Sequence, residues 1–327
     1  MTVLSDSFQR PINYLRISVT DRCNLRCIYC MPPEGVHLIP RGEILSYEEI
    51  YLVAQAAAEL GINKLRLTGG EPLVRDSLPD LIQMLAKIEN VDDISLTTNG
   101  VLLSKYAATL KKAGLKRVNI SLDSLQPDRF QQITRRDRLK EVLSGIEAAK
   151  EAGLNPVKIN MVVMRGINDD EILQFASKTI AEGWHVRFIE FMPVGNVAGA
   201  KEEWFMPISE IKSRIELLGR LEPYPLDGNG PAKYFRLPKA KGTIGFIGPV
   251  SEHICFKCNR LRLTAEGKLR PCLLSDREID LREQLRRRDS TEEIKSLIKQ
   301  AVASKPGGHK LKSGVRPTKR IMAQIGG

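Results

Sequence analysis

Six short runs in the first 192 residues alternate apolar and polar positions, and longer amphipathic segments separate them. The runs cover Tyr14–Thr20, Lys64–Thr68, Asp93–Thr97, Arg117–Ser121, Val157–Val163 and His185–Phe191. A period of two is typical of β-strands, whereas the intervening segments have the periodicity of helices. A strand followed by a helix, six times over, predicts parallel βα units of an α/β fold. The pattern leaves open whether the sheet closes into a barrel or stays open and doubly wound.

The segment after the first strand carries the markers of a helix at both ends. Ser46 is expected to cap the N-terminus, Glu49 completes a capping box, and Gly61 ends the helix. Comparable glycine stops follow at Gly114, Gly153 and Gly183. The boundaries of the helices therefore support the βα interpretation independently of the strands.

The predicted strands are polar on one face, although buried parallel strands usually read as continuous apolar runs. In the first strand Leu15, Ile17 and Val19 share one face, opposite Arg16, Ser18 and Thr20. The polar sets of the next four strands are Lys64, Arg66 and Thr68; Ser95 and Thr97; Asn119 and Ser121; and Lys158 and Asn160. If helices cover the apolar face, the polar face lines a hydrated, cationic cavity, because burying unpaired Arg and Lys is costly. The alternative is a sheet with one solvent-exposed face.

Beyond Met192 the pattern changes. We expect a helix over Pro207–Leu218, irregular chain or short hairpins from 223 to 249, a hairpin of Arg260–Thr264 with Lys268–Cys272, and helices over Ile279–Arg288 and Thr291–Ala303. A Ser290/Glu293 capping box marks the last of these helices. The chain is therefore divided into a βα domain, residues 1–200, and a C-terminal extension, residues 201–327, that ends in a basic Gly-Gly tail. Residues 303–327 carry no acidic residue and six basic ones, Lys305, Lys310, Lys312, Arg316, Lys319 and Arg320, so we expect this tail to reach into the site of an anionic ligand.

Composition narrows the class of protein. The 327 residues include 50 Lys and Arg against 39 Asp and Glu, a net charge of +11, and 42% of residues are hydrophobic. These proportions exclude a disordered or fibrous chain. No run of 18 apolar residues occurs, and Asp6, Arg10 and Arg16 interrupt the N-terminus where a signal peptide would be apolar, so we expect a cytoplasmic protein. The positive charge favours an anionic partner, but composition does not choose among nucleic acid, a nucleotide and a lipid surface.

All six cysteines fall into two triplets, and clustered thiols in a reducing compartment are more often metal ligands than disulfides. Cys23, Cys27 and Cys30 form CxxxCxxC in the loop after the first strand. Three thiolates at this spacing can bind three irons of a cubane and leave the fourth open, whereas zinc normally takes four protein ligands. The second triplet is Cys255, Cys258 and Cys272. A zinc site completed by His253 remains an alternative there.

Two motifs together carry a family resemblance. CxxxCxxC has an aromatic residue, Tyr29, before its last cysteine, and Gly69-Gly70-Glu71-Pro72 follows the second strand. In this order and spacing they resemble the radical S-adenosylmethionine enzymes. The resemblance implies a partial, six-unit βα barrel and a [4Fe–4S] cluster on Cys23, Cys27 and Cys30. It also implies S-adenosylmethionine contacted by Tyr29, Gly70, Ser121 and Met192 and cleaved to a 5′-deoxyadenosyl radical that abstracts hydrogen from a substrate.

Further segments narrow the resemblance to one group within that family. They are Asp21-Arg-Cys-Asn-Leu-Arg-Cys-Ile-Tyr-Cys-Met-Pro, Leu67-Thr-Gly-Gly-Glu-Pro-Leu, Thr97-Thr-Asn-Gly, Arg187-Phe-Ile-Glu-Phe-Met-Pro-Val-Gly, Cys255-x-x-Cys-Asn-Arg-Leu-Arg-Leu-Thr and the terminal Gly326-Gly327. The set is similar to the GTP 3′,8-cyclases of molybdenum cofactor biosynthesis (the MoaA type). This implies a second [4Fe–4S] cluster on Cys255, Cys258 and Cys272 that holds the guanine of GTP. By motif position Arg16, Arg66, Lys158, Arg260 and Arg262 grip the triphosphate, with Thr97 nearby.

The resemblance also implies partners. These are an electron donor such as flavodoxin, a cyclic pyranopterin monophosphate synthase that takes the product, and a second copy of the chain as a candidate homodimer partner. No membrane or nucleic acid is expected. A conventional GTPase is disfavoured, because the sequence has no GxxxxGK[ST] loop. Two other interpretations stay open: a two-cluster radical enzyme that modifies a peptide or RNA, and a non-enzymatic, zinc-stabilised RNA-binding module.

Overall fold

A computed structural model describes residues 4–195, 201–226, 230–252, 254–287, 291–309, 311 and 316–326. Its strands are β1 (Tyr14–Ser18), β2 (Lys64–Thr68), β3 (Asp93–Thr98), β4 (Arg117–Ser121), β5 (Val157–Val163), β6 (His185–Glu190), β7 (Glu222–Pro223), β8 (Lys233–Arg236), β9 (Thr243–Ile247), β10 (Arg260–Leu263), β11 (Lys268–Arg270) and β12 (Ile279–Asp280). Its α-helices are α1 (Tyr47–Glu59), α2 (Leu78–Leu85), α3 (Leu103–Lys112), α4 (Pro127–Thr134), α5 (Leu139–Glu151), α6 (Ile172–Ala181), α7 (Ile208–Ile215), α8 (Arg282–Arg287) and α9 (Thr291–Ala303). The six predicted strands of the βα region are confirmed.

All these strands belong to one open, curved sheet, ordered β12-β11-β10-β1-β2-β3-β4-β5-β6-β9-β8-β7. Every neighbouring pair from β10 to β9 is parallel, and the strands outside this stretch pair antiparallel. The expected six-unit partial barrel is present, and the C-terminal extension adds one parallel strand at each edge. Strands from both sides of residue 200 share this sheet. The division of the chain into two domains at that residue stays a prediction.

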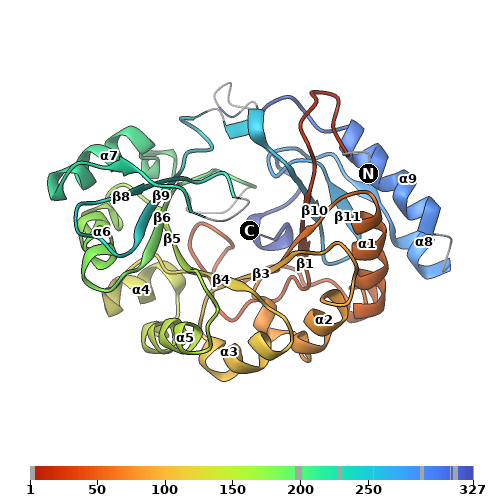
Figure 1. Cartoon of the computed structure of the whole chain (residues 1–327), viewed down its shortest axis with the longest axis horizontal. Helices are drawn as coiled ribbons and strands as arrows, with labels where there is room; N and C mark the ends of the chain where they lie inside the picture. The colour runs from red at the N-terminus through yellow and green to blue at the C-terminus, as the bar shows by residue number, and fades with distance from the viewer. Residues whose placement is uncertain are drawn as a thin grey trace.

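Helices α1 to α7 lie around the outer side of the curved sheet, as Figure 1 shows. Leu15, Ile17, Leu65 and Leu67 point to that side and are fully buried. The predicted capping box at α1 is present: Ser46 Oγ accepts from the Glu49 amide at 3.1 Å, and Glu49 Oε2 accepts from the Ser46 amide at 2.7 Å. The apolar face of each strand therefore carries the helices, as the alternation predicts.

The sequence predicts irregular chain or short hairpins between residues 223 and 249, and the structure has an antiparallel pair there, β8 and β9. The sequence did not indicate that β9 would pair parallel with β6. Gly245 of β9 makes this pairing possible, because a Cβ there would lie 2.9 Å from Cγ of Arg187 on β6. A glycine in the strand leaves room for a large inward side chain on its neighbour.

The predicted helix over Ile279–Arg288 is wrong in its first turn. Ile279 and Asp280 form β12 against β11, and α8 begins at Arg282. Asp280 Oδ1 accepts from the Arg282 amide at 2.9 Å, so its carboxylate satisfies a backbone donor at the helix start that no intrahelical bond can satisfy. Helix α9 is confirmed, while Ser290 of its predicted capping box lies outside the described residues.

The C-terminal segment ends inside the curve of the sheet, where the C label stands in Figure 1. Gly326 packs against Thr68 and Ser18 on the polar face of β2 and β1. The chain terminus thus approaches the polar face of the strands. None of the described helices is long and apolar enough to span a membrane.

Candidate functional site

A cavity of about 310 Å³ opens on the polar face of the sheet, at the carboxyl ends of the strands. In parallel βα folds this is the end at which loops from successive strands converge. The cavity is lined by every predicted site residue except Lys158: Arg16, Cys23, Cys27, Tyr29, Cys30, Arg66, Gly70, Thr97, Ser121, Met192, Cys255, Cys258, Arg260, Arg262 and Cys272. The predicted cationic cavity is therefore present.

The loop with the first cysteine triplet is held against α4. The amides of Arg26 and Ile28 donate to the carbonyls of Thr134 and Ile133, each at 2.9 Å. Arg135, whose φ is +56°, donates to the Arg26 carbonyl at 2.7 Å. Backbone contacts therefore fix this loop, and its thiols remain available.

Tyr29 is anchored from the other side of the cavity. Its hydroxyl donates to Asp123 Oδ2 at 2.7 Å, and Asp123 Oδ1 accepts from the Val162 amide at 2.8 Å. Burial raises the pKa of Asp123 to about 6. Asp123 lies on the continuation of the polar face of β4, two positions past Ser121, and so ties the aromatic residue of the cysteine motif to β4 and β5.

The Gly-Gly-Glu-Pro segment brings two loops into close contact. A Cβ at Gly70 would lie 2.4 Å from the Arg22 carbonyl oxygen, so only glycine fits beside the cysteine loop. Glu71 is buried and accepts from Thr98 Oγ1 at 2.7 Å and from the Asn99 amide at 2.6 Å. Burial raises the pKa of Glu71 to about 7. The motif thus joins the ends of β1, β2 and β3.

Cys258 of the second triplet differs from the thiols of the first triplet in its electrostatic surroundings. Burial raises the pKa of Cys23 to about 11, with Glu71 adding to the effect, and burial raises the pKa of Cys30 to about 12. Burial also opposes ionisation of Cys258, but Arg260 and Lys305 outweigh it and lower the pKa of that thiol to about 6. Thiol ligands bind metal as thiolates. Cys258 is therefore the thiol at which positive charge from the protein favours the ligand form, whereas burial raises the pKa of Cys255 in the same triplet.

Lys305, which the sequence indicates only as one charge of the basic tail, lies close to Cys258 and Cys272 of the second triplet. Its ammonium donates to the carbonyls of Arg260 at 2.7 Å and Pro271 at 2.6 Å, and it contacts Cys258. Arg10 attaches the N-terminal turn to the same region by donating to the Cys255 carbonyl at 2.8 Å. The cysteines of the extension are thus positioned by residues from both ends of the chain.

A cation cluster, defined as Arg16, Arg66, Lys158, Arg187 and Arg262, lies on the inner face of the sheet, and all five side chains are buried. Burial lowers the pKa of Arg16 well below its ordinary value, with Arg262 adding to the effect. Burial, with neighbouring arginines, lowers the pKa of Lys158 to about 7. The buried polar atoms of the described residues that have no hydrogen-bond partner include Nε of Arg187 and the hydroxyl of Tyr14. Such a group of positive charges is complementary to a buried polyanion.

Lys158 is set back from the cavity. It faces the ring of Tyr234 at 5.0 Å from Nζ to the ring centroid, and His185 and Asn119 are its register neighbours on β6 and β4. Lys158 does not line the cavity, so it can influence a bound anion there only by the electrostatic effect of its charge. Arg187 does line the cavity, and the alternation in His185–Phe191 could have identified it, because Val186 and Phe188 occupy the opposite face.

The C-terminal segment meets the cation cluster directly. The Gly326 carbonyl accepts from Arg16 at 3.1 Å and from Arg262 at 3.2 Å, and Met322 and Ala323 line the cavity. Gly327 lies outside the described residues. A carbonyl group from the chain end is thus bound by Arg16 and Arg262, two of the cations that the family resemblance assigns to the triphosphate.

The donor set of each triplet fits an iron–sulfur cluster. Each consists of three free thiols, and both triplets open on the same cavity. Cys23, Cys27 and Cys30 would hold one cluster, and Cys255, Cys258 and Cys272 the other. Within the described part of the chain, no group of three or more His, Cys, Asp or Glu side chains has the arrangement of a single-ion metal site. The proposed fourth zinc ligand, His253, lies outside the described residues.

Comparisons with known proteins place these features in a family. The radical SAM superfamily model matches residues 17–178, and the molybdenum cofactor synthesis C-terminal model matches residues 184–311. A GTP 3′,8-cyclase of Thermodesulfovibrio yellowstonii is 54% identical over 99% of this chain and 100% of that protein. A GTP 3′,8-cyclase of Pelotomaculum thermopropionicum is 53% identical over the same shares of the two chains.

The fold is also similar to a solved structure. Streptococcus suis SuiB bound to S-adenosylmethionine superposes with a TM-score of 0.62 at 13% identity. The match covers 83% of this chain and 64% of SuiB. At this identity the similarity concerns the fold alone.

The set-back lysine gives a pH-dependent prediction. Inorganic triphosphate in the cavity should raise the pKa of Lys158 from about 7, so binding at pH 8 should take up a proton. Affinity should be highest below pH 7 and weaken as the pH rises and the unbound lysine loses its charge. Calorimetry in buffers of different ionisation enthalpy measures this uptake. K158M should show less uptake than the parent, and equal uptake in both would show that another group titrates.

Proposed function

The chain belongs to the family of GTP 3′,8-cyclases, and on that premise we propose that it converts GTP to (8S)-3′,8-cyclo-7,8-dihydroguanosine 5′-triphosphate, the first step of molybdopterin biosynthesis. The observation that carries the proposal is that four members of the cation cluster, Arg16, Arg66, Arg187 and Arg262, line the same cavity as both thiol triplets. A nucleoside triphosphate needs cations for its phosphates and a separate contact for its base. The cavity offers both.

The two triplets have different roles in this proposal. Cys23, Cys27 and Cys30 hold the cluster that binds S-adenosylmethionine, and Cys255, Cys258 and Cys272 hold the cluster that binds the guanine. When bound, the first cluster and S-adenosylmethionine supply a 5′-deoxyadenosyl radical, which takes hydrogen from the ribose C3′ before that carbon bonds to guanine C8. Tyr29, Gly70, Ser121 and Met192 orient S-adenosylmethionine. The protein's remaining task is to hold C3′ close to both the radical and C8.

Positioning of the substrate falls to the cations. Arg260 and Arg262 are two residues apart on β10, and Arg16 and Arg262 are register neighbours on β1 and β10. Guanidinium groups bind phosphate oxygens in pairs, so this arrangement fixes the triphosphate in orientation as well as in place. Arg66 and Lys158 add charge from β2 and β5, with Thr97 nearby on β3. We propose Arg187 as a further triphosphate contact, because it lines the same cavity.

The partners remain proposals of the same kind. The reaction needs two electrons, one to cleave S-adenosylmethionine and one that, with a proton, reduces the radical left on the substrate after C3′ bonds to C8. An acidic electron donor such as flavodoxin suits a chain of charge +11. A cyclic pyranopterin monophosphate synthase is the consumer of the product, the setting is cytoplasmic, and a second copy of the chain is a further candidate partner. The alternative substrate class, a peptide or RNA, fits less well, because the cation cluster is buried and a polymer needs an open groove.

Iron content tests the two clusters. Anaerobically reconstituted protein should contain about eight irons, because each triplet would hold four. C23A and C255A should each lose about half of the iron. The measurement is iron, sulfide and zinc analysis together with an optical spectrum. Two stoichiometric zincs, or a single variant that loses all the iron without unfolding, would contradict the assignment.

Substrate binding tests the arginines on β10. R262A should weaken GTP binding about 10- to 100-fold, since charge-assisted hydrogen bonds contribute about 1.5–3 kcal/mol. Cleavage of S-adenosylmethionine should persist at least in part, because the first triplet is untouched. Arg286 offers the control: it is exposed on α8, and R286A changes the net charge equally. Equal GTP affinity in R262A and R286A would remove Arg262 from the site.

Truncation tests the chain end. Deleting Gly326 and Gly327 removes the carbonyl between Arg16 and Arg262. We expect both clusters and the fold to persist and the cyclised product to be lost. Product analysis by mass spectrometry, with iron content as the control, measures this. Product at the parental rate would show that the chain end has no role in the reaction.

A further inference from the structure

The C-terminal segment 316–326 is joined to the hairpin of β10 and β11 by a network of buried charges. We propose that Arg320 is a positioning residue: its ion pairs with Glu278 and Glu266 hold this segment so that the Gly326 carbonyl stays between Arg16 and Arg262. The docking itself depends only on this chain's own residues. Its consequence for catalysis rests on the proposed function.

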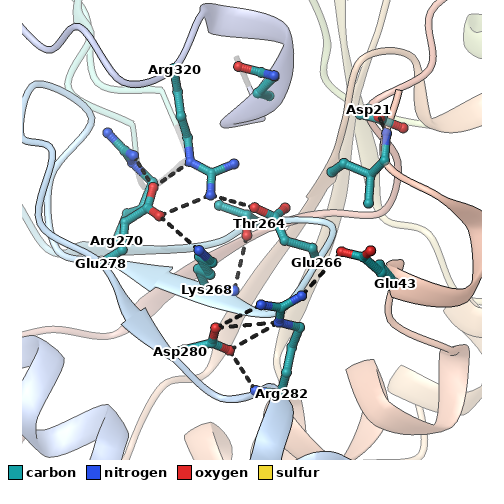
Figure 2. A network of polar contacts seen from close by, with 12 residues as sticks. Asp21, Glu43, Thr264, Glu266, Lys268, Arg270, Glu278, Asp280, Arg282 and Arg320 are labelled. Atoms are coloured by element: carbon teal, nitrogen blue, oxygen red, sulfur yellow. Dashed lines mark hydrogen bonds and ion pairs between the residues drawn. The ribbon is translucent and has the colours of Figure 1, made fainter. Parts of the chain in front are cut away.

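The contact between Arg320 and Glu278 has the geometry of a fork. Nε of Arg320 donates to Glu278 Oε1 at 2.5 Å, and a terminal nitrogen donates to Oε2 at 2.9 Å. The same guanidinium forms a second ion pair with Glu266, as Figure 2 shows. The side chains of Arg320, Glu278 and Glu266 are only 13%, 17% and 8% exposed. A two-point, largely desolvated contact fixes direction as well as distance, which a surface ion pair does not.

Glu278 is oriented from behind by a second arginine. The Arg270 side chain is fully buried, pairs with Glu278, and donates to the Ser275 carbonyl at 2.5 Å. Lys268 lies 3.9 Å from the same carboxylate. Glu278 therefore keeps positive partners when Arg320 is replaced, so that replacement does not leave its carboxylate buried without a counter-charge. Replacement of Arg320 therefore spares Glu278, whereas it removes the ion pair of Glu266 in the β10–β11 turn, so exchange of the hairpin has to be followed together with that of the tail.

The network connects the tail to the part of the chain that carries the substrate arginines. Glu266 lies in the turn between β10 and β11, and β10 contains Arg260 and Arg262. Just before Arg320, the amides of Thr318 and Lys319 donate to Asp276 at 3.0 and 3.4 Å. The position of the hairpin and the position of the chain end are therefore set together.

The loop after β6 holds the other side of the segment. The Gly195 amide donates to the Pro317 carbonyl at 3.1 Å, and a Cβ at Gly195 would lie 2.6 Å from the Arg320 carbonyl oxygen. This loop follows Met192, a proposed S-adenosylmethionine contact. The C-terminal segment is therefore contacted at Arg320 from two sides, by the loop after β6 and by Glu278 and Glu266.

Arg316 provides a matched control within the same segment. It pairs with Glu202, whose side chain is 74% exposed. Exposed ion pairs contribute little to stability. R316Q removes the same charge from the tail as R320Q and removes only a solvated contact.

Peptide-level hydrogen exchange of the holoenzyme tests the proposal. In R320Q we expect amides of 316–326 to exchange about 10- to 100-fold faster than in the parent, as the loss of charged hydrogen bonds predicts. Amides of β10 and β11 and the iron content should be unchanged. R316Q should exchange like the parent. R320K, which keeps the charge without the fork, should fall between parent and R320Q.

The catalytic arm uses the same variants. R320Q should lose cyclised product while its affinity for S-adenosylmethionine is unchanged, and R316Q should keep parental turnover. Exchange in R320Q equal to that in R316Q would overturn the proposal, and so would faster exchange with parental turnover. If the parent itself forms no cyclised product from GTP, the proposed function fails, and the exchange data still decide whether Arg320 holds the tail.

Discussion

Positive charge buried on the inner face of a parallel sheet is the constraint on which the rest of this structure depends. Arg16, Arg66, Lys158, Arg187 and Arg262 are withdrawn from water, and burial together with neighbouring arginines lowers the pKa of Lys158 to about 7. The sheet tolerates these residues because its inner face encloses a cavity and because the chain end supplies an acceptor. A cavity in this state is prepared for a polyanion, which would supply the missing negative charge.

The loops around the cavity are positioned by backbone contacts and by two anchoring side chains, Tyr29 and Glu71. Arg26 and Ile28 fix the first cysteine loop through their amides, and Gly70 allows another loop to approach within van der Waals contact. The close backbone approach explains why glycines accompany the cysteines in the motif, because it admits no Cβ.

The burial of the cations also distinguishes an enzyme that binds a small polyanion from an RNA-binding module. An RNA-binding module would present its cations on the surface, where phosphates along a polymer can reach them. Here the arginines of the cation cluster are buried and line a cavity of about 310 Å³ that both cysteine triplets also line. A small polyanion that arginines and a metal cluster bind within one cavity agrees with this arrangement, and an extended polymer does not.

The sequence by itself determined the βα order, the strand faces and the two cysteine triplets, because these depend on periodicity and spacing along the chain. Alternation placed Arg16, Arg66 and Lys158 on one face correctly, and continued by one strand it would have included Arg187. Short elements were less predictable: Ile279 and Asp280 became a strand because β11 offered an unpaired edge, which local propensity cannot detect. Lys305 and Arg320 were recognisable from the sequence only as charges of the basic tail, and Glu278 carried no signal. Their roles arise from contacts between segments far apart in the chain, and only the tertiary structure brings those charges together.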